Sequence, residues 1–205
     1  MKAQSQVISI IIIVAIALGA IALVLPWTYG MIQKKKDMKS LDDVYYFFQD
    51  LDETIRDVAN NGGEETLTLE TPGVFTVYPE SSNSPFNNSI VFNFTSKVSN
   101  IAQGDWIPLN TPNMNATATL GVDTHSVIFG KAIKVGDQLS IEYRIWYRGL
   151  YDAYGDGYAI HFNTTGNNIK TSTSGFLRVQ RLGTKEINVA GKDLTITEIY
   201  IIVWK

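Results

Sequence analysis

The sequence contains no cysteine. Disulfide bonds, thiolate metal ligands and cysteine nucleophiles are therefore excluded, and cysteine usage leaves the redox compartment open. Histidine is nearly absent too, because the chain has only His125 and His161, each in or beside a predicted strand, where we expect a structural role. The sequence also lacks metalloprotease, serine-hydrolase and phosphate-loop motifs. These absences predict a protein that is not an enzyme and that uses no cofactor.

Charge is scarce as well. The formal net charge is −3, and no basic, aromatic-rich pattern appears along the chain, so nucleic acid is not an expected partner. One stretch, Val7 to Leu25, has no charged residue and is apolar almost throughout. With a rise of ~1.5 Å per residue, a helix of this length spans about 30 Å, the thickness of the hydrocarbon core of a bilayer.

This stretch cannot rest in water. A buried isoleucine or leucine is worth roughly 2–3 kcal/mol relative to an exposed one, so exposing the whole stretch would cost tens of kcal/mol. We therefore expect the helix to lie either in lipid or among identical helices from other copies of the chain.

The following residues predict a helix that continues to residue 61. Pro26 removes a backbone donor, so a kink or break is expected near Leu25. Residues 38–59 are amphipathic, and the Asn-Asn-Gly-Gly sequence at 60–63 ends the helix. The apolar residues that share one face of the amphipathic part are Val44, Phe48, Leu51, Ile55 and Val58.

Four consecutive aromatic residues, at 45–48, lie within the amphipathic part. A helix that packs on one domain buries only a stripe, so the four cannot all face that domain. Either Tyr46 and Phe47 lie half exposed along the edge of the domain, or neighbouring copies of the chain cover them.

Residues 64–205 are expected to form a β-rich domain, because the apolar period there changes to two. Hairpin turns are predicted at Gly136–Asp137 and at 190–192, and the apolar final run, 196–204, is expected deep in a sheet. The predicted strands are 65–69, 74–78, 89–95, 116–122, 126–135, 138–147, 158–162, 168–173, 176–180, 185–189 and 194–204. We therefore predict an α+β protein, in which a long N-terminal hydrophobic helix precedes an antiparallel β-sandwich or barrel, with an immunoglobulin-like arrangement among the candidates.

Two aspartates in one glycine-containing loop are the only candidate metal ligands. Asp152 and Asp156 offer the hard oxygen atoms that calcium prefers. Their spacing does not match an EF-hand, and Asp-Gly is also what a tight turn requires, so turn chemistry is the simpler interpretation.

Four Asn-x-Ser/Thr triplets are candidate glycosylation sites, provided that they lie on an exported surface. Asn87 and Asn115 lie in regions that look like loops and are the better candidates, and all four triplets point weakly to an outward-facing domain. Their asparagines are Asn87, Asn93, Asn115 and Asn163.

The order of features at the N-terminus is distinctive. Met1, Lys2 and Ala3 form a short basic leader, three polar residues follow, and the apolar helix then begins. Over roughly residues 1–60 this layout resembles the archaeal type IV pilin superfamily, which includes the archaellins and has class III signal peptides. The resemblance implies that a prepilin peptidase cuts between Ala3 and Gln4 and that ATPase-driven machinery assembles the subunits into a filament at the cell surface.

In that family the apolar helices leave the membrane and pack together as the core of the filament. Moving a helix from lipid into a bundle gains no hydrophobic energy, so close packing by β-branched and small residues must favour the bundle. We therefore expect a structural subunit of an adhesion pilus or archaellum, with identical subunits as partners and the membrane as its location before assembly. The expected assembly residues are Val7, Ile11, Val14, Leu18, Gly19, Ala22, Leu25, Tyr46 and Phe47.

A single-span membrane anchor is the alternative interpretation of the same helix. Trp27 and Tyr29 stand where an interfacial aromatic belt is expected, and three lysines follow at 34–36. By the positive-inside rule these lysines favour a cytoplasmic location for the rest of the chain, whereas the sequons and the strand-rich body favour export. In this alternative the β-rich domain is a membrane-tethered ectodomain that binds a surface ligand.

Overall fold

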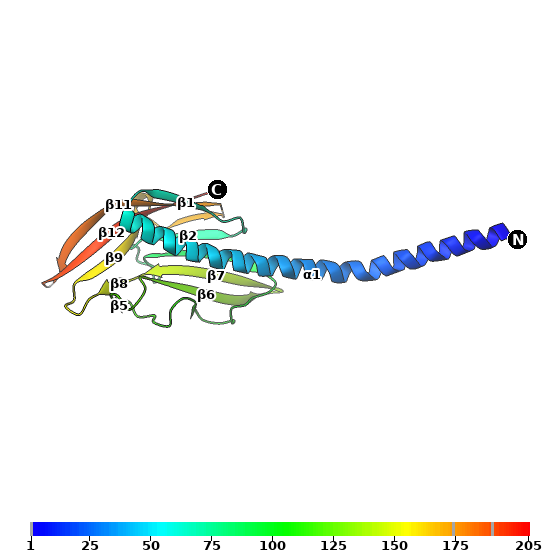
Figure 1. Ribbon diagram of the computed structural model, residues 1–205, viewed down its shortest axis with the longest axis horizontal. Helices are drawn as coiled ribbons and strands as arrows, with labels where there is room; N and C mark the ends of the chain where they lie inside the picture. The colour runs from blue at the N-terminus through cyan, green and yellow to red at the C-terminus, as the bar shows by residue number, and fades with distance from the viewer. Residues whose placement is uncertain (1, 174, 190) are drawn as a thin grey trace. The chain divides into compact units, whose positions relative to one another are not determined.

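The computed structural model describes residues 2–173, 175–189 and 191–205, with side chains from residue 11 onward except at 189. The chain divides into two compact units, one that ends at Lys39 and one from Ser40 to Lys205. A single helix, α1 (Lys2–Asn61), forms the described part of the first unit and begins the second (Figure 1). The β-strands all belong to the second unit.

In the first unit α1 continues through Pro26. A full break near Leu25, one of the two expected outcomes, is therefore wrong. Proline removes one backbone hydrogen bond and crowds the carbonyl four residues earlier, but the turns on both sides of Pro26 remain helical. In the turn that contains Pro26, the hydroxyl of Thr28 also donates to the carbonyl of Val24, with 3.0 Å between the oxygen atoms.

In the second unit the predicted amphipathic face of α1 is confirmed. All five of its apolar residues are at most 2% exposed. The predicted end of the helix is confirmed too, because Gly62 has a φ of 80° and its N–H donates to the carbonyl of Val58 at 2.9 Å. This is the left-handed C-terminal cap that glycine adopts without steric cost.

The strands form two six-stranded sheets, so the predicted α+β class is confirmed. Sheet 1 contains, in spatial order, β1 (Glu64–Thr68), β11 (Phe176–Val189), β12 (Lys192–Trp204), β9 (Gly157–Asn163), β8 (Gly149–Tyr151) and β5 (Thr117–Thr119). Sheet 2 contains β10 (Lys170–Thr173), β2 (Val74–Tyr78), β3 (Ser89–Ser96), β7 (Gln138–Tyr147), β6 (Ser126–Val135) and β4 (Ile107–Pro108). A short 3₁₀ helix, η1 (Thr165–Asn167), follows β9.

Most neighbouring strands are antiparallel, but β12 with β9 and β5 with β8 are parallel. The expectation of a purely antiparallel arrangement is wrong for these two pairs. Parallel neighbours require a long connection, and here β10 and β11 lie between β9 and β12 in the sequence. Strand periodicity carries no information about such non-local pairing.

The positions of most strands agree with the sequence pattern. The predicted turn between β6 and β7 is confirmed, because Val135 lies opposite Gln138 and Gly136 has a φ of 61°. The other predicted turn, at 190–192, begins at Ala190, which lies outside the described residues. The final strand, β12, is an interior strand of sheet 1, as expected.

Three strand predictions need correction. The segments 176–180 and 185–189 belong to one strand, β11, whose register shifts between Arg181 and Gly183. The predicted strand 116–122 contains only the three residues of β5, and Leu120 and Val122 beyond it are exposed. The strands β4 and β8 were not predicted, because two or three residues are too few to show a period.

One hydrophobic core joins the C-terminal part of α1 to both sheets. The ring of Phe48 lies 5.8 Å from that of Tyr143 in β7, and α1 crosses β2 and β7 in Figure 1. The ring of Tyr147 lies 5.1 Å from that of Phe162 in β9, which connects sheet 2 to sheet 1. The core residues that are described begin at Leu41.

Phe47 belongs to this core. It is 6% exposed, and its ring lies 5.6 Å from that of Phe75 in β2. The expectation that Phe47 lies half exposed or is covered by neighbouring copies is therefore wrong, whereas Tyr46 is 61% exposed. Because α1 shares its core with strands of both sheets, its buried face is wider than the stripe of a helix on one surface.

Candidate functional site

The candidate functional site is the apolar segment of α1, from Ile11 to Leu25. Every side chain of this segment is exposed in the single chain, and Leu23, for example, is 81% exposed. An 18-residue window of the helix has a mean hydropathy of 2.5 and is not buried at all. Among the described residues this is the one helix long and apolar enough to cross a membrane. An apolar surface of this extent marks a contact with lipid or with protein.

Six of the expected assembly residues lie on this segment with exposed side chains: Ile11, Val14, Leu18, Gly19, Ala22 and Leu25. Val7 and the two residues of the expected cleavage site, Ala3 and Gln4, lie in α1, but their side chains are outside the described residues. A Cβ atom added at Gly19 would meet no atom of the chain within 4 Å. The chain itself therefore does not require glycine there, whereas a second helix can approach the bare backbone closely.

Polar residues follow the apolar segment in an ordered way. Trp27 and Tyr29 are 69% and 70% exposed, and the three lysines at 34–36 are exposed as well. Across these lysines, the side-chain amide of Gln33 donates to a carboxylate oxygen of Asp37 at 2.7 Å. Apolar, aromatic and basic residues in this order are typical of a helix that leaves a bilayer. The same order suits a helix that leaves a dry protein bundle.

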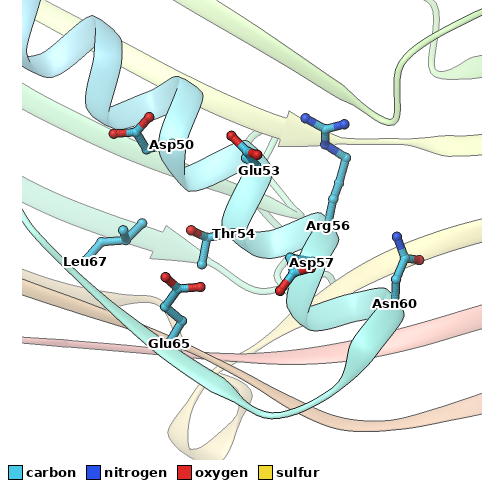
Figure 2. Close-up of a pocket in the computed structure, with 8 residues that line it drawn as sticks. All are labelled: Asp50, Glu53, Thr54, Arg56, Asp57, Asn60, Glu65 and Leu67. Atoms are coloured by element: carbon cyan, nitrogen blue, oxygen red, sulfur yellow. The ribbon is translucent and has the colours of Figure 1, made fainter.

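The β-rich unit has a separate surface feature, an acidic groove between the last turns of α1 and β1, with a volume of about 560 Å³. Figure 2 shows Asp50, Glu53 and Asp57 on the helix and Glu65 on the strand. Arg56 lies at its rim and pairs with Asp52, with 3.1 Å between Nη2 and Oδ2. Over the part of the chain that the structure describes, no three histidine or acidic side chains are placed to hold a metal ion.

In the loop with the two candidate calcium ligands, both carboxylates accept hydrogen bonds from backbone N–H groups. Asp152 Oδ1 accepts hydrogen bonds from the backbone N–H groups of Tyr154 and Asp156, at 2.8 and 3.0 Å. Asp156 Oδ1 accepts the N–H of Asp193 at 2.9 Å. These bonds favour the turn interpretation over a calcium site.

Both histidines lie in partly buried positions. The ring of His125 packs edge-on against that of Tyr158, with centroids 5.1 Å apart. Burial lowers the pKa of His125 and of His161 below the usual value of 6.5, so both are neutral in the folded chain at pH 7. This geometry supports the predicted structural role.

Comparisons with protein-family models, with curated proteins and with solved structures find no match to this chain. The functional argument therefore depends on the chemistry and geometry of the chain itself.

The structure also shows a buried polar residue that sequence reasoning missed. Asn88 is 4% exposed and has a φ of 52°. Its side-chain N–H groups donate to the carbonyls of Tyr147 and Ile160, at 2.9 and 2.7 Å, and its side-chain oxygen accepts the N–H of Phe162 at 2.8 Å. Asn88 thus bridges β7 of sheet 2 and β9 of sheet 1. No local pattern distinguishes it from the neighbouring loop asparagines.

A second missed pair joins α1 to sheet 2. The hydroxyl of Tyr147 donates to Asp52 Oδ1 at 2.5 Å, and both residues are buried. Burial and the adjacent carboxylate raise the pKa of Tyr147 well above 10. The signal in the sequence is an acidic residue next to the apolar face of the helix, flanked by Asp50 and Glu53, and nothing local distinguishes it from them.

Proposed function

We propose that this chain is a structural, non-enzymatic subunit of a type IV-like archaeal surface filament. Its apolar helix packs among the same helices of other copies, and its β-rich unit faces outward. A prepilin peptidase cuts the chain between Ala3 and Gln4. Before assembly the subunit resides in the membrane, from which ATPase-driven machinery extracts it. Either an adhesion pilus or an archaellum fits this proposal.

One observation carries the proposal: the folded unit completes its core without the apolar segment. The described core residues begin at Leu41, whereas the side chains from Ile11 to Leu25 are exposed and none of them belongs to the described core. At roughly 2 kcal/mol for each large apolar side chain, an external environment must cover the segment.

The composition of the segment favours a protein environment over lipid alone. Lipid and a helical bundle are equally apolar, so the preference must come from close packing. Gly19 and Ala22 expose backbone that a neighbouring helix can approach, and Ile11 and Val14 provide rigid β-branched shapes. Because the two environments differ little in free energy, extraction by an energy-consuming machine is a reasonable part of the proposal.

We further infer that the two sheets form a β-sandwich around the end of α1. The shared core and the Tyr147–Phe162 contact between the sheets support this arrangement. An immunoglobulin-like strand order is the finer alternative within it.

Electron microscopy of the purified native protein tests the proposed function. We expect helical fibres whose core consists of the N-terminal helices alone, and we expect no fibres when residues 1–37 are deleted. The substitution Gly19→Leu is a sharper test. It keeps the segment apolar, and its Cβ would meet no atom beyond the adjacent helix backbone within 4 Å, yet it adds bulk where helices are expected to approach closely.

Leu23→Ile is the matched control, because it keeps apolar volume at an exposed position. We expect fibres from Leu23→Ile and none from Gly19→Leu, with both variants still in the membrane fraction. A wild-type protein that persists as single copies, each helix surrounded by lipid, would overturn the proposal in favour of the membrane-tethered binding domain.

A further inference from the structure

The four Asn-x-Ser/Thr triplets differ sharply in their surroundings. A sugar attached to asparagine needs a free side-chain nitrogen and open space around the triplet. This holds whether the sugar is attached before or after folding, because the folded chain must accommodate it. The structure therefore allows the four sites to be compared.

Three triplets are embedded in the fold. Next to Asn87, Asn88 bridges the two sheets, and Ser89 is fully buried with its hydroxyl donating to the carbonyl of Phe86 at 2.5 Å. Asn93 lies in the middle of β3, and its side-chain nitrogen donates to Ser140 and to Glu142, at 2.9 and 3.1 Å.

Asn163 is the last residue of β9 and is half buried. The next residue, Thr164, is 2% exposed. A sugar at this position would have to leave the end of an interior strand of sheet 1.

The fourth triplet, Asn115-Ala116-Thr117, is exposed at all three residues. Its backbone is nevertheless held firmly. The guanidinium group of Arg148, which is 3% exposed, donates to the carbonyl of Asn115 at 3.0 Å and to that of Asn113 at 2.9 Å. Arg148 thus fixes the backbone of the triplet while the side chain of Asn115 lies in solvent.

Asn115 also stands beside a surface that benefits from a cover. The triplet ends in Thr117, the first residue of β5, which is the last strand of sheet 1. The backbone N–H and C=O of Thr119 at this edge are already bonded to Asp123, so what the edge exposes is chiefly side chains. Exposed apolar side chains surround the same edge: Met114, Leu120 and Val122 are 51%, 47% and 81% exposed. A groove of about 520 Å³ runs along β5 and is lined by Thr117, Ala118, Thr119, Tyr151, Asp152 and Ala153.

We propose that Asn115 carries an N-linked oligosaccharide that covers the exposed apolar side chains beside β5. The inference rests on one part of the proposed function, the export of the β-rich unit, since only an exported domain meets the transferase. The donor is a lipid-linked oligosaccharide phosphate. The side-chain nitrogen of Asn115 forms a bond to the anomeric carbon, the bond from that carbon to the phosphate oxygen breaks, and the lipid phosphate leaves. The amide loses one proton, which a base of the transferase accepts, so no oxidant or reductant is needed.

Mass spectrometry of peptides from the protein purified from the cells that make it tests this inference. We expect a sugar mass on the peptide that contains Asn115 and an unmodified peptide for Asn93. Thr117→Ala keeps Asn115 but destroys the triplet, so the sugar should be lost, whereas Thr117→Ser should retain it. We also expect Thr117→Ala to associate through the uncovered apolar side chains beside β5, visible as a larger particle by light scattering in detergent.

The outcomes separate the two proposals. Fibres whose Asn115 is bare would overturn the glycan inference and leave the filament proposal intact. Single membrane-bound copies with a sugar on Asn115 would overturn the filament proposal and leave the glycan inference intact. A sugar that survives in Thr117→Ala, or that is found on Asn93 instead, would overturn the inference as well.

Discussion

At the scale of single residues, Asn88 makes the side-chain hydrogen bonds that bridge the two sheets. Asn88→Asp keeps the shape of the side chain but turns its donor nitrogen into an acceptor that faces the carbonyls of Tyr147 and Ile160. We expect the free energy of unfolding to fall by about 2–4 kcal/mol, because buried polar groups lose their partners. Thermal or urea unfolding of the full chain in detergent measures this.

Asn83→Asp is the matched control, because Asn83 lies in the same loop and is exposed. Its unfolding free energy should change by less than about 0.5 kcal/mol. Equal effects of the two substitutions would mean that the bridge between the sheets contributes little.

The contact between Tyr147 and Asp52 gives a second test at this scale. Tyr147→Phe removes a buried hydrogen bond to a carboxylate, and we expect a loss of about 1.5–3 kcal/mol in unfolding free energy. A double-mutant cycle with Asp52→Asn should show a coupling energy of at least about 0.5 kcal/mol, as residues in direct contact do. Additive effects would contradict the contact.

The burial of His125 leads us to expect that the stability of the fold depends on pH. Burial lowers its pKa below 6.5, so the unfolded chain takes up the proton more readily than the folded chain. Stability is therefore complete above pH 6.5 and decreases as the pH falls from 6.5 toward the lowered pKa. His125→Phe keeps a ring against Tyr158 but does not titrate. We expect its melting temperature to fall less than that of the wild type between about pH 7.5 and about pH 5.5.

Other titrating groups do not disturb this comparison. His161 acts in the same direction, and the raised pKa of Glu80 acts in the opposite one, but both are present in the variant and in the wild type. The same fall in melting temperature for both proteins would show that His125 does not titrate in this range.

At the scale of elements, the run of aromatics in α1 separates core from surface. Phe47→Ala should lower the unfolding free energy by about 3–5 kcal/mol, because it leaves a cavity against Phe75. Tyr46→Ala, one residue earlier and exposed, should change it by less than about 0.5 kcal/mol. If Tyr46 contacts neighbouring copies, Tyr46→Ala will reduce fibre formation without affecting the melting temperature.

At the scale of the whole molecule, the two compact units predict that the β-rich unit folds independently. Removing residues 1–37 leaves every described core residue in place, from Leu41 onward. We expect this truncated chain to be soluble and to melt within a few degrees of the full chain in detergent. Broad or absent unfolding by circular dichroism would show that the apolar segment is needed for folding.

Much of this protein could be predicted from local patterns. The lack of charge from Val7 to Leu25 determined that this segment cannot rest in water, and helical or alternating periods located the amphipathic face and most strands. Gly62 determined the end of α1, because a left-handed residue is needed there and glycine adopts it without cost. These features depend on neighbours in the sequence, so they are visible without the fold.

Only the tertiary structure decided which aromatic of α1 is buried, which strands are parallel, and which of four similar triplets stands free. Phe47 is in the core because two sheets share the helix, and Asn115 is open while Asn93 is occupied because of strands far away in the sequence. Such contacts depend on non-local packing, which no short stretch of sequence encodes. The tertiary structure also decided that the described core closes from Leu41 onward, without the apolar segment, because the two sheets and the end of α1 bury one another.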